Sequence, residues 1–74
     1  MQEYRFHLSI PWQAMARYYQ GQAEVVVCQD TQGRVMHIHP RYFRPHLTRD
    51  GVNGWFLLRL NSQGQFVELR KESE

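Results

Sequence analysis

The sequence contains a single cysteine, Cys28, in 74 residues, so no disulfide can form within the chain. No apolar run approaches the roughly 18 to 20 residues that a membrane-spanning helix needs. The first residues, MQEYRFHLSIPW, alternate between polar and apolar instead of forming the apolar core of a signal peptide. These absences predict a cytoplasmic protein that does not enter a membrane, in which Cys28 is a small buried hydrophobic side chain.

The sequence also lacks the residue patterns of a catalytic site. Ser9 precedes a predicted helix, Ser62 lies in a predicted turn, and Cys28 stands alone in an apolar run. No glycine-rich loop offers a phosphate cradle between a strand and a helix. We therefore expect no enzymatic activity and no small-molecule cofactor. A cyclic-dinucleotide site is also disfavoured, because the DGVNG segment at 50–54 is a poor match to the Asp-x-Ser-x-x-Gly element that such a site requires.

The composition is that of one small globular domain. Hydrophobic residues make up 42% of the chain and charged residues 22%, which is near the average for folded proteins. The length predicts a single domain over residues 1–74, because independent domains mostly have about 50 to 250 residues. The formal charge of +2 is too small to indicate nucleic-acid binding by itself. The arrangement of the basic residues must decide that question.

A strand followed by a helix is predicted at the start of the chain. Residues 4–10 alternate between apolar and polar side chains, which is the period of a half-buried strand. Pro11 ends this strand, and Gly21 can end a helix over residues 11–20. The apolar residues of this helix recur at spacings that place them on one face, and they are Trp12, Met15, Ala16 and Tyr19. That face is expected to dock on the sheet.

A first β-hairpin is predicted from residues 23–28 and 34–39, joined by the turn residues DTQG. A two-residue loop would set Val27 opposite Met36 on an apolar face. The opposite face would then carry Glu24, Val26, His37 and His39. A bulge at Gly33 would shift this register by one residue and exchange the faces of one strand. We expect the register without the bulge.

A second hairpin is predicted from residues 54–60 and 66–70. A loop centred on Gln63 and Gly64 sets Leu58 against Leu69 and Leu60 against Val67 on one face. The same register sets Arg59 against Glu68 on the other face, as a cross-strand pair of opposite charges. The charged tail at 71–74 is expected to fray.

These elements predict an α+β fold with the order β-α-β-β-β-β. The five strands would form a strongly bent antiparallel sheet, or a small SH3-like or Sm-like barrel, with the one short helix across a face. The segment from 39 to 54 is too long for a plain turn and contains several prolines and glycines. Because long loops in compact domains often carry function, this segment is the first place to search for a binding site.

The loop at 39–49 has the composition of a single-stranded nucleic-acid site. It carries Arg41, Arg44 and Arg49, with Tyr42 between the first two. Arginine can fork onto phosphate oxygens while an aromatic ring stacks on an unpaired base. We expect a non-enzymatic binding module that uses these four residues. The alternative is that PRYFRP forms a turn of 3₁₀ helix, in which Phe43 and Leu47 plug the open end of the barrel and the arginines are solvated or paired with carboxylates.

A second functional hypothesis is a homodimer or another protein interaction domain. In the expected registers, Trp55, Leu57 and Val26 face away from the core and form an apolar outer sheet face. Such a face must be covered by a second copy, by closure of the barrel, or by the helix face that bears Trp12 and Tyr19.

Metal binding is not expected. His37 and His39 share a face of a predicted strand, and His46 or His7 could complete a zinc site with three nitrogen ligands. However, no cysteine or carboxylate stands at a firm ligand spacing nearby. We therefore interpret these histidines as surface or structural residues.

The chain resembles a family of bacterial proteins of about seventy residues known as domain of unknown function 2835. The resemblance rests on Ile10 and Pro11 after the opening strand, RYYQG at 17–21, the Arg-Pro pair at 44 and 45, DGVNG at 50–54, and the strand that starts GWFLL. It implies a small bacterial cytoplasmic protein and assigns no activity. The two histidines at 37 and 39 are not part of the shared pattern.

Overall fold

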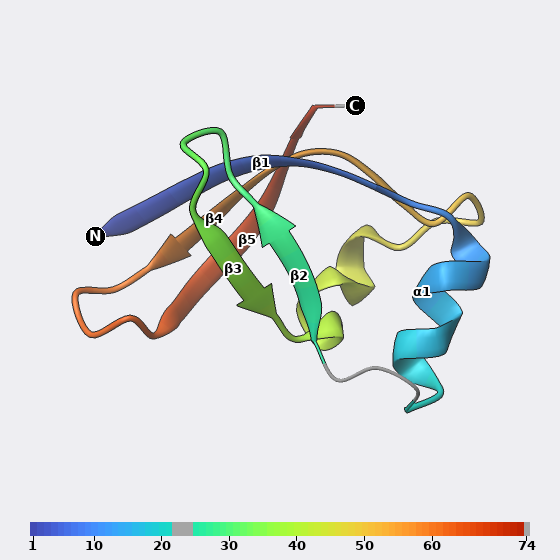
Figure 1. The fold of residues 1–74 in the computed structure, drawn as a ribbon. Coiled ribbons are helices and arrows are strands. Elements are labelled where there is room, and N and C mark those ends of the chain that lie inside the picture. Colours follow the sequence, from blue (N-terminus) through green and yellow to red (C-terminus); the bar gives the residue numbers. More distant parts are fainter. Residues whose placement is uncertain (22–24, 74) are drawn as a thin grey trace.

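A computed structural model describes residues 1–21 and 25–73 as a mostly β protein with two short helices (Figure 1). The order of strands and α-helix is the predicted one, and a 3₁₀ helix stands in the long loop. The elements are β1 (Gln2–Ile10), α1 (Trp12–Tyr19), β2 (Val26–Gln29), β3 (Val35–Ile38), η1 (Pro40–His46), β4 (Val52–Leu60) and β5 (Phe66–Ser73).

The strands form two sheets instead of one. β1, β4 and β5 make a three-stranded antiparallel sheet in the order β1-β4-β5, and β2 and β3 make a separate hairpin. The prediction of a single five-stranded sheet or a closed barrel is therefore wrong. The hairpin is tied to the edge of the larger sheet at its turn, where the Thr31 N–H donates to the Arg5 carbonyl at 3.0 Å. β3 does not pair with β5, so the side of the molecule between these strands stays open.

Three phenylalanines from different elements form the centre of the core. The rings of Phe6 on β1 and Phe56 on β4 stack with centroids 5.7 Å apart, and Phe43 from η1 meets both rings edge-on. All three side chains are almost fully buried. Each such burial is worth about 1.5 to 3 kcal/mol. The 3₁₀ helix over PRYFRP and the burial of Phe43 are confirmed, but no barrel forms, so there is no barrel end for Phe43 to plug.

The alternation in β1 is also confirmed. Phe6 is buried and its apolar neighbours at alternate positions pack against the core, whereas Arg5, His7 and Ser9 are exposed. In α1, Met15 is fully buried as expected. Trp12 is 45% exposed, so its placement on the docked face is wrong. It begins the helix and lies next to the loop at 47–49.

The β2–β3 hairpin adopts the shifted register. Val26 pairs with Ile38 and Cys28 pairs with Met36, and these four residues point into the core. Val27, which was predicted to face the core, is 60% exposed. The face expected for Val26 is therefore wrong. His37 and His39 are exposed, and Glu24 lies outside the described residues.

The turn of this hairpin explains the shift. Gly33 has a φ of +82° and donates its N–H to the Asp30 carbonyl at 3.1 Å. The Asp30 carboxylate folds back over the turn and accepts hydrogen bonds from the backbone of Gln32 and Arg34. This glycine bulge places one more residue in the loop than the register without a bulge allows.

The β4–β5 hairpin keeps most of the predicted register. Leu58 lies opposite Leu69, and Arg59 lies opposite Glu68, as expected. Beyond them a bulge sets Leu60 opposite Phe66 instead of Val67. β5 also continues to Ser73, so the expectation of a frayed tail does not hold for residues 71–73, and residue 74 lies outside the described part.

Candidate functional site

The helix η1 places Arg41 and Arg44 on one side. Pro40 occupies its first position, where a missing N–H costs nothing, and the His39 ring Nδ1 accepts the Arg41 N–H at 3.1 Å. The helix closes where the Leu47 N–H donates to the Arg44 carbonyl. Residues three apart eclipse each other in a 3₁₀ helix, so the two arginines project from the same side. Both are exposed.

Each of these two arginines lies over a tyrosine ring. The Arg41 guanidinium carbon is 5.0 Å from the centroid of Tyr42, and that of Arg44 is 4.9 Å from the centroid of Tyr19 on α1. Burial raises the pKa of Tyr19, whose hydroxyl donates to the Pro40 carbonyl at 2.9 Å and joins α1 to η1. The rings hold the guanidinium groups in place and leave their N–H donors largely available.

Arg49 occupies the tight turn between η1 and β4. Thr48 and Gly51 exchange two backbone hydrogen bonds, at 2.9 and 3.0 Å, which leaves Arg49 at the exposed tip. Arg49 and Trp12 share an open depression at the start of α1. Tyr19, whose ring lies under the Arg44 guanidinium, is at the other end of α1, about 10 Å from Trp12 along the helix axis. The structure thus brings two of the three predicted arginines together on η1 and sets the third beside Trp12.

Tyr42 is covered on its ring by two neighbours. It stacks on Phe66 of β5 with centroids 3.9 Å apart and planes 14° apart, and the Arg41 guanidinium also lies over the ring, so the structure does not support the predicted stacking of a base on Tyr42. Trp12 is the exposed aromatic residue that sequence reasoning missed. Its spacing from Met15 and Tyr19 suggested a core position. Its place as the first helical residue, directly after Pro11, was the available signal that it could lie outside the core.

The ion pairs divide the arginines into two groups. Most paired arginines lie on the outer face of the three-stranded sheet, where Arg5 pairs with Glu72 at 2.7 Å and Arg59 with Glu68 at 3.0 Å. The arginines with a carboxylate partner are Arg5, Arg34, Arg59 and Arg70. Among residues 1–21 and 25–73, those without one are Arg17, Arg41, Arg44 and Arg49. The second group lies on α1, η1 and the turn that follows.

The apolar outer face predicted for self-association does not form as expected. Val26 is 1% exposed and Leu57 is 4% exposed, so both are covered within one chain. Leu57 lies between Arg5 on β1 and Arg70 on β5, and the long side chains of these arginines bridge to Glu72 above the sheet. Trp55 remains partly exposed and packs against His7. Dimerisation itself stays a prediction.

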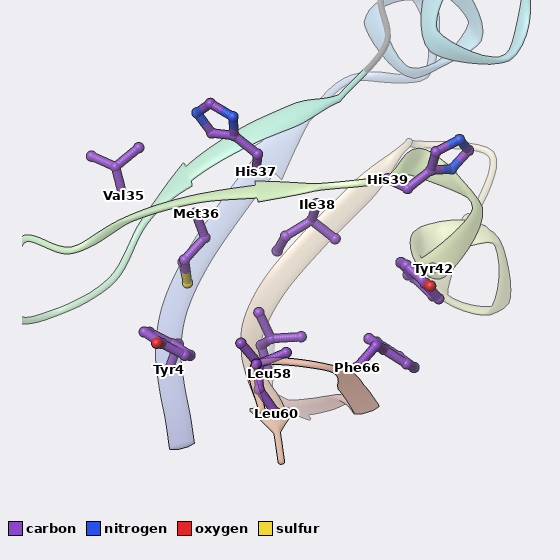
Figure 2. A pocket seen from close by; sticks show the side chains of 11 residues that line it. Tyr4, Val35, Met36, His37, Ile38, His39, Tyr42, Leu58, Leu60 and Phe66 are labelled. Carbon is purple, nitrogen blue, oxygen red and sulfur yellow. The ribbon is translucent and has the colours of Figure 1, made fainter. Parts of the chain in front are cut away.

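An apolar groove lies between β3 and the β4–β5 hairpin (Figure 2). It has a volume of about 310 Å³. Met36 and Ile38 line it from β3, and Leu58 and Leu60 from β4. The rest of its wall is formed by Tyr4, Val35, His37, His39, Tyr42, Gly64 and Phe66. In a closed barrel β3 would pair with β5, and the groove lies where that pairing is absent.

The histidines do not gather into a metal site. His46 Nε2 lies 3.0 Å from the Leu69 carbonyl and His7 packs on Trp55, so neither joins His37 and His39. Within the described part of the chain, no three histidine, cysteine or acidic residues are placed to hold a metal ion. No helix in that part is long and apolar enough to cross a membrane.

A protein-family model described as "Protein of unknown function (DUF2835)" matches residues 2–72. No curated protein and no solved structure matches the chain.

Proposed function

The chain belongs to the DUF2835 family, whose function is unknown, and we propose that it is a non-enzymatic module that binds single-stranded nucleic acid. The proposed contact surface consists of Arg41, Arg44, Arg49 and Trp12, and we call it the arginine surface. It lies on η1, on the turn that follows and at the start of α1.

The observation that carries this proposal is the separation of paired and unpaired arginines. The sheet arginines are held by Glu3, Glu68 and Glu72 in a network that neutralises them. The three arginines of the arginine surface have no carboxylate partner in the described part of the chain. Asp50 is the one acidic residue in the segment from 39 to 54. A guanidinium that keeps its donors free is suited to bind phosphate oxygens in a fork-like geometry.

The exposed Trp12 favours a single strand over a duplex. Its indole shares a depression with Arg49, so a phosphate on that arginine would bring an adjacent base within reach of the ring. Bases stack on an aromatic side chain only when they are free of the duplex, and each such contact is worth about 1 to 3 kcal/mol. Arginines next to an exposed ring are the usual composition of such binding sites.

Titration of fluorescein-labelled dT12 and rU12 tests the proposal. Three phosphate contacts to a single strand predict an affinity that falls roughly 20-fold between 50 and 200 mM salt. Replacing all three arginines with glutamine should abolish both the binding and its salt dependence. The proposal fails if neither oligonucleotide binds at low salt, or if the triple variant binds as tightly as the wild type.

Two variants that each remove one charge distinguish binding at the arginine surface from binding that depends only on the net charge. Arg41→Gln and Arg70→Gln remove the same charge, but Arg70 lies in the outer-face network, where it is close to Glu68 and Glu72. We expect the first change to weaken binding several-fold and the second to leave it nearly unchanged. Equal losses would show that binding follows the total charge, and would contradict the assignment to the arginine surface.

A further inference from the structure

The groove between β3 and the β4–β5 hairpin has a hydrogen-bonding wall. The consecutive residues 35–39 all line it. Successive side chains of a strand point to opposite faces, so a continuous run can line a groove only through its backbone edge. Asp30 and Arg34 are a hydrogen-bonded pair, because the Asp30 N–H donates to the Arg34 carbonyl. Hydrogen-bonded and non-hydrogen-bonded pairs alternate along an antiparallel ladder, so Val35 and His37 are in non-hydrogen-bonded pairs with β2. Their N–H and C=O groups therefore point away from β2, into the groove.

The other surfaces of the groove suit a flat apolar group of limited length. Met36 and Ile38 face Leu58 and Leu60 across it (Figure 2). Aromatic residues mark the two ends, with Tyr4 at one end and the stacked pair of Tyr42 and Phe66 at the other. β3 itself has four residues. A strand edge of four residues offers few hydrogen bonds to an added peptide, whereas a cavity of about 310 Å³ is large enough for a single planar ring.

The charge at one end of the groove selects an anionic ligand. Arg41 lies over Tyr42 and donates from Nη2 to its hydroxyl at 3.1 Å, so the guanidinium stands beside the aromatic end of the groove. His39 lines the same end. In the described part of the chain, no aspartate or glutamate lines the groove. A ligand with a negative group at Arg41 and a flat apolar ring next to it complements this arrangement.

We propose that the groove binds one unpaired base of a nucleic-acid strand whose phosphate lies on Arg41. This inference rests on the proposed function and adds the place where a base is held. The π faces of the base contact the aliphatic and aromatic side chains, and its polar edge meets the free backbone groups of Val35 and His37. A hydrophobic slot with a few polar groups at its edge is the usual form of a small-ligand site.

The test compares dT12 with an abasic strand that has the same length and number of phosphates. We expect dT12 to bind about tenfold more tightly, which is within the range for one stacked base. Phe66→Ala should remove most of this difference. Val67→Ala is the matched control, because Val67 is the next residue of β5, is 45% exposed and does not line the groove. It should preserve the difference.

The outcomes separate this inference from the proposed function. If neither strand binds, the proposed function fails and the base site fails with it. If both strands bind equally, the base site and the stacking on Trp12 are both overturned, and only the phosphate contacts of the three arginines survive. If Phe66→Ala and Val67→Ala behave alike, the base site alone is overturned. If dTMP displaces labelled dT12 as well as unlabelled dT12 does at equal concentration, the ligand is a free nucleotide, and the assignment to a strand is wrong.

A second measurement does not depend on a variant. In amide NMR spectra of the wild-type protein, dT12 should shift the signals of Val35 and His37, and the abasic strand should not. Shifts confined to η1 and α1 with both strands would overturn the base site.

Discussion

The carboxylate of Asp30, whose side chain has no exposed surface, accepts a hydrogen bond from Arg34 Nε at 2.6 Å inside the β2–β3 turn. Burial of this carboxyl opposes its ionisation, but hydrogen bonds from the backbone and side chain of Arg34 outweigh that effect. The pKa of Asp30 is therefore lower than its ordinary value of 3.8. The ionised group holds together the turn that sets the register of the hairpin.

Asp30→Ala should lower the melting temperature at neutral pH by several degrees, because it leaves the turn N–H groups without their acceptor. Because the folded pKa lies below the ordinary value, the carboxylate stabilises the folded protein fully above pH 3.8. This stabilisation is lost as the pH falls through the folded pKa. The difference in melting temperature between wild type and variant should therefore become smaller at acidic pH. Calorimetry at pH 7 and about pH 2 measures this. Asp50→Ala, at an exposed position, is the control and should change the melting temperature at neutral pH little.

Gly51 holds the turn of Arg49 against the start of α1. It has a φ of +101°, and an added Cβ would run into the carbonyl oxygen of Ile10 and the backbone of Pro11 and Trp12. Gly51→Ala should therefore cost clearly more than the about 1 to 2 kcal/mol expected for a left-handed residue alone. Gly64→Ala is the control, since it has a φ of +79° with open space around it. Urea denaturation compares the two, and equal losses would contradict the close approach.

The thiol of Cys28 should be unreactive in the folded protein. Burial raises its pKa from 9.0 to about 11, and the side chain lies in the core with 5% of its surface exposed. The thiolate is the reactive form, so a disulfide reagent at pH 8 should modify the native protein at least tenfold more slowly than the urea-unfolded protein. Similar rates in the two states would show that β2 opens readily or that the thiol is accessible.

Arg59 and Glu68 form a cross-strand pair within a larger network. Arg59 Nε also lies 3.1 Å from Glu3 Oε2, and Arg70 lies 4.0 Å from Glu68. Reversing both charges, as Arg59→Glu with Glu68→Arg, restores the central pair but leaves position 59 negative beside Glu3. The double variant should therefore lose less stability than the sum of the two single variants, yet remain below the wild type. Strict additivity in urea denaturation would mean that the two residues do not interact.

Local patterns predicted the elements of this fold well. Alternation identified β1, proline and glycine marked the limits of α1, and opposite charges fixed the register at Arg59 and Glu68. The β2–β3 register depended on Asp30 turning its carboxylate into the loop, and turn composition alone does not reveal that choice. The sequence also could not predict whether the barrel closes, because closure depends on whether β3 and β5, which are far apart in sequence, approach each other.

The candidate site was also predicted only where local patterns determine it. The arginine and tyrosine content of the loop at 39–49 identified Arg41 and Arg44, and the 3₁₀ spacing sets them on one side. The stacking of Tyr42 on Phe66 is a contact across 24 positions of the chain, so no local pattern indicates it. The groove arises because β3 stays apart from β5, and only the three-dimensional arrangement shows it.

The edge of the three-stranded sheet has a consequence for aggregation. β5 pairs with β4 on one side, and an unpaired strand edge is a template on which another molecule can add. This strand carries Glu68, Arg70, Lys71 and Glu72. A neighbouring copy that tried to extend the sheet would have to bring its own charges of the same kinds against them and strip them of water. The charges of the network that covers Leu57 therefore also disfavour the addition of another strand at this edge.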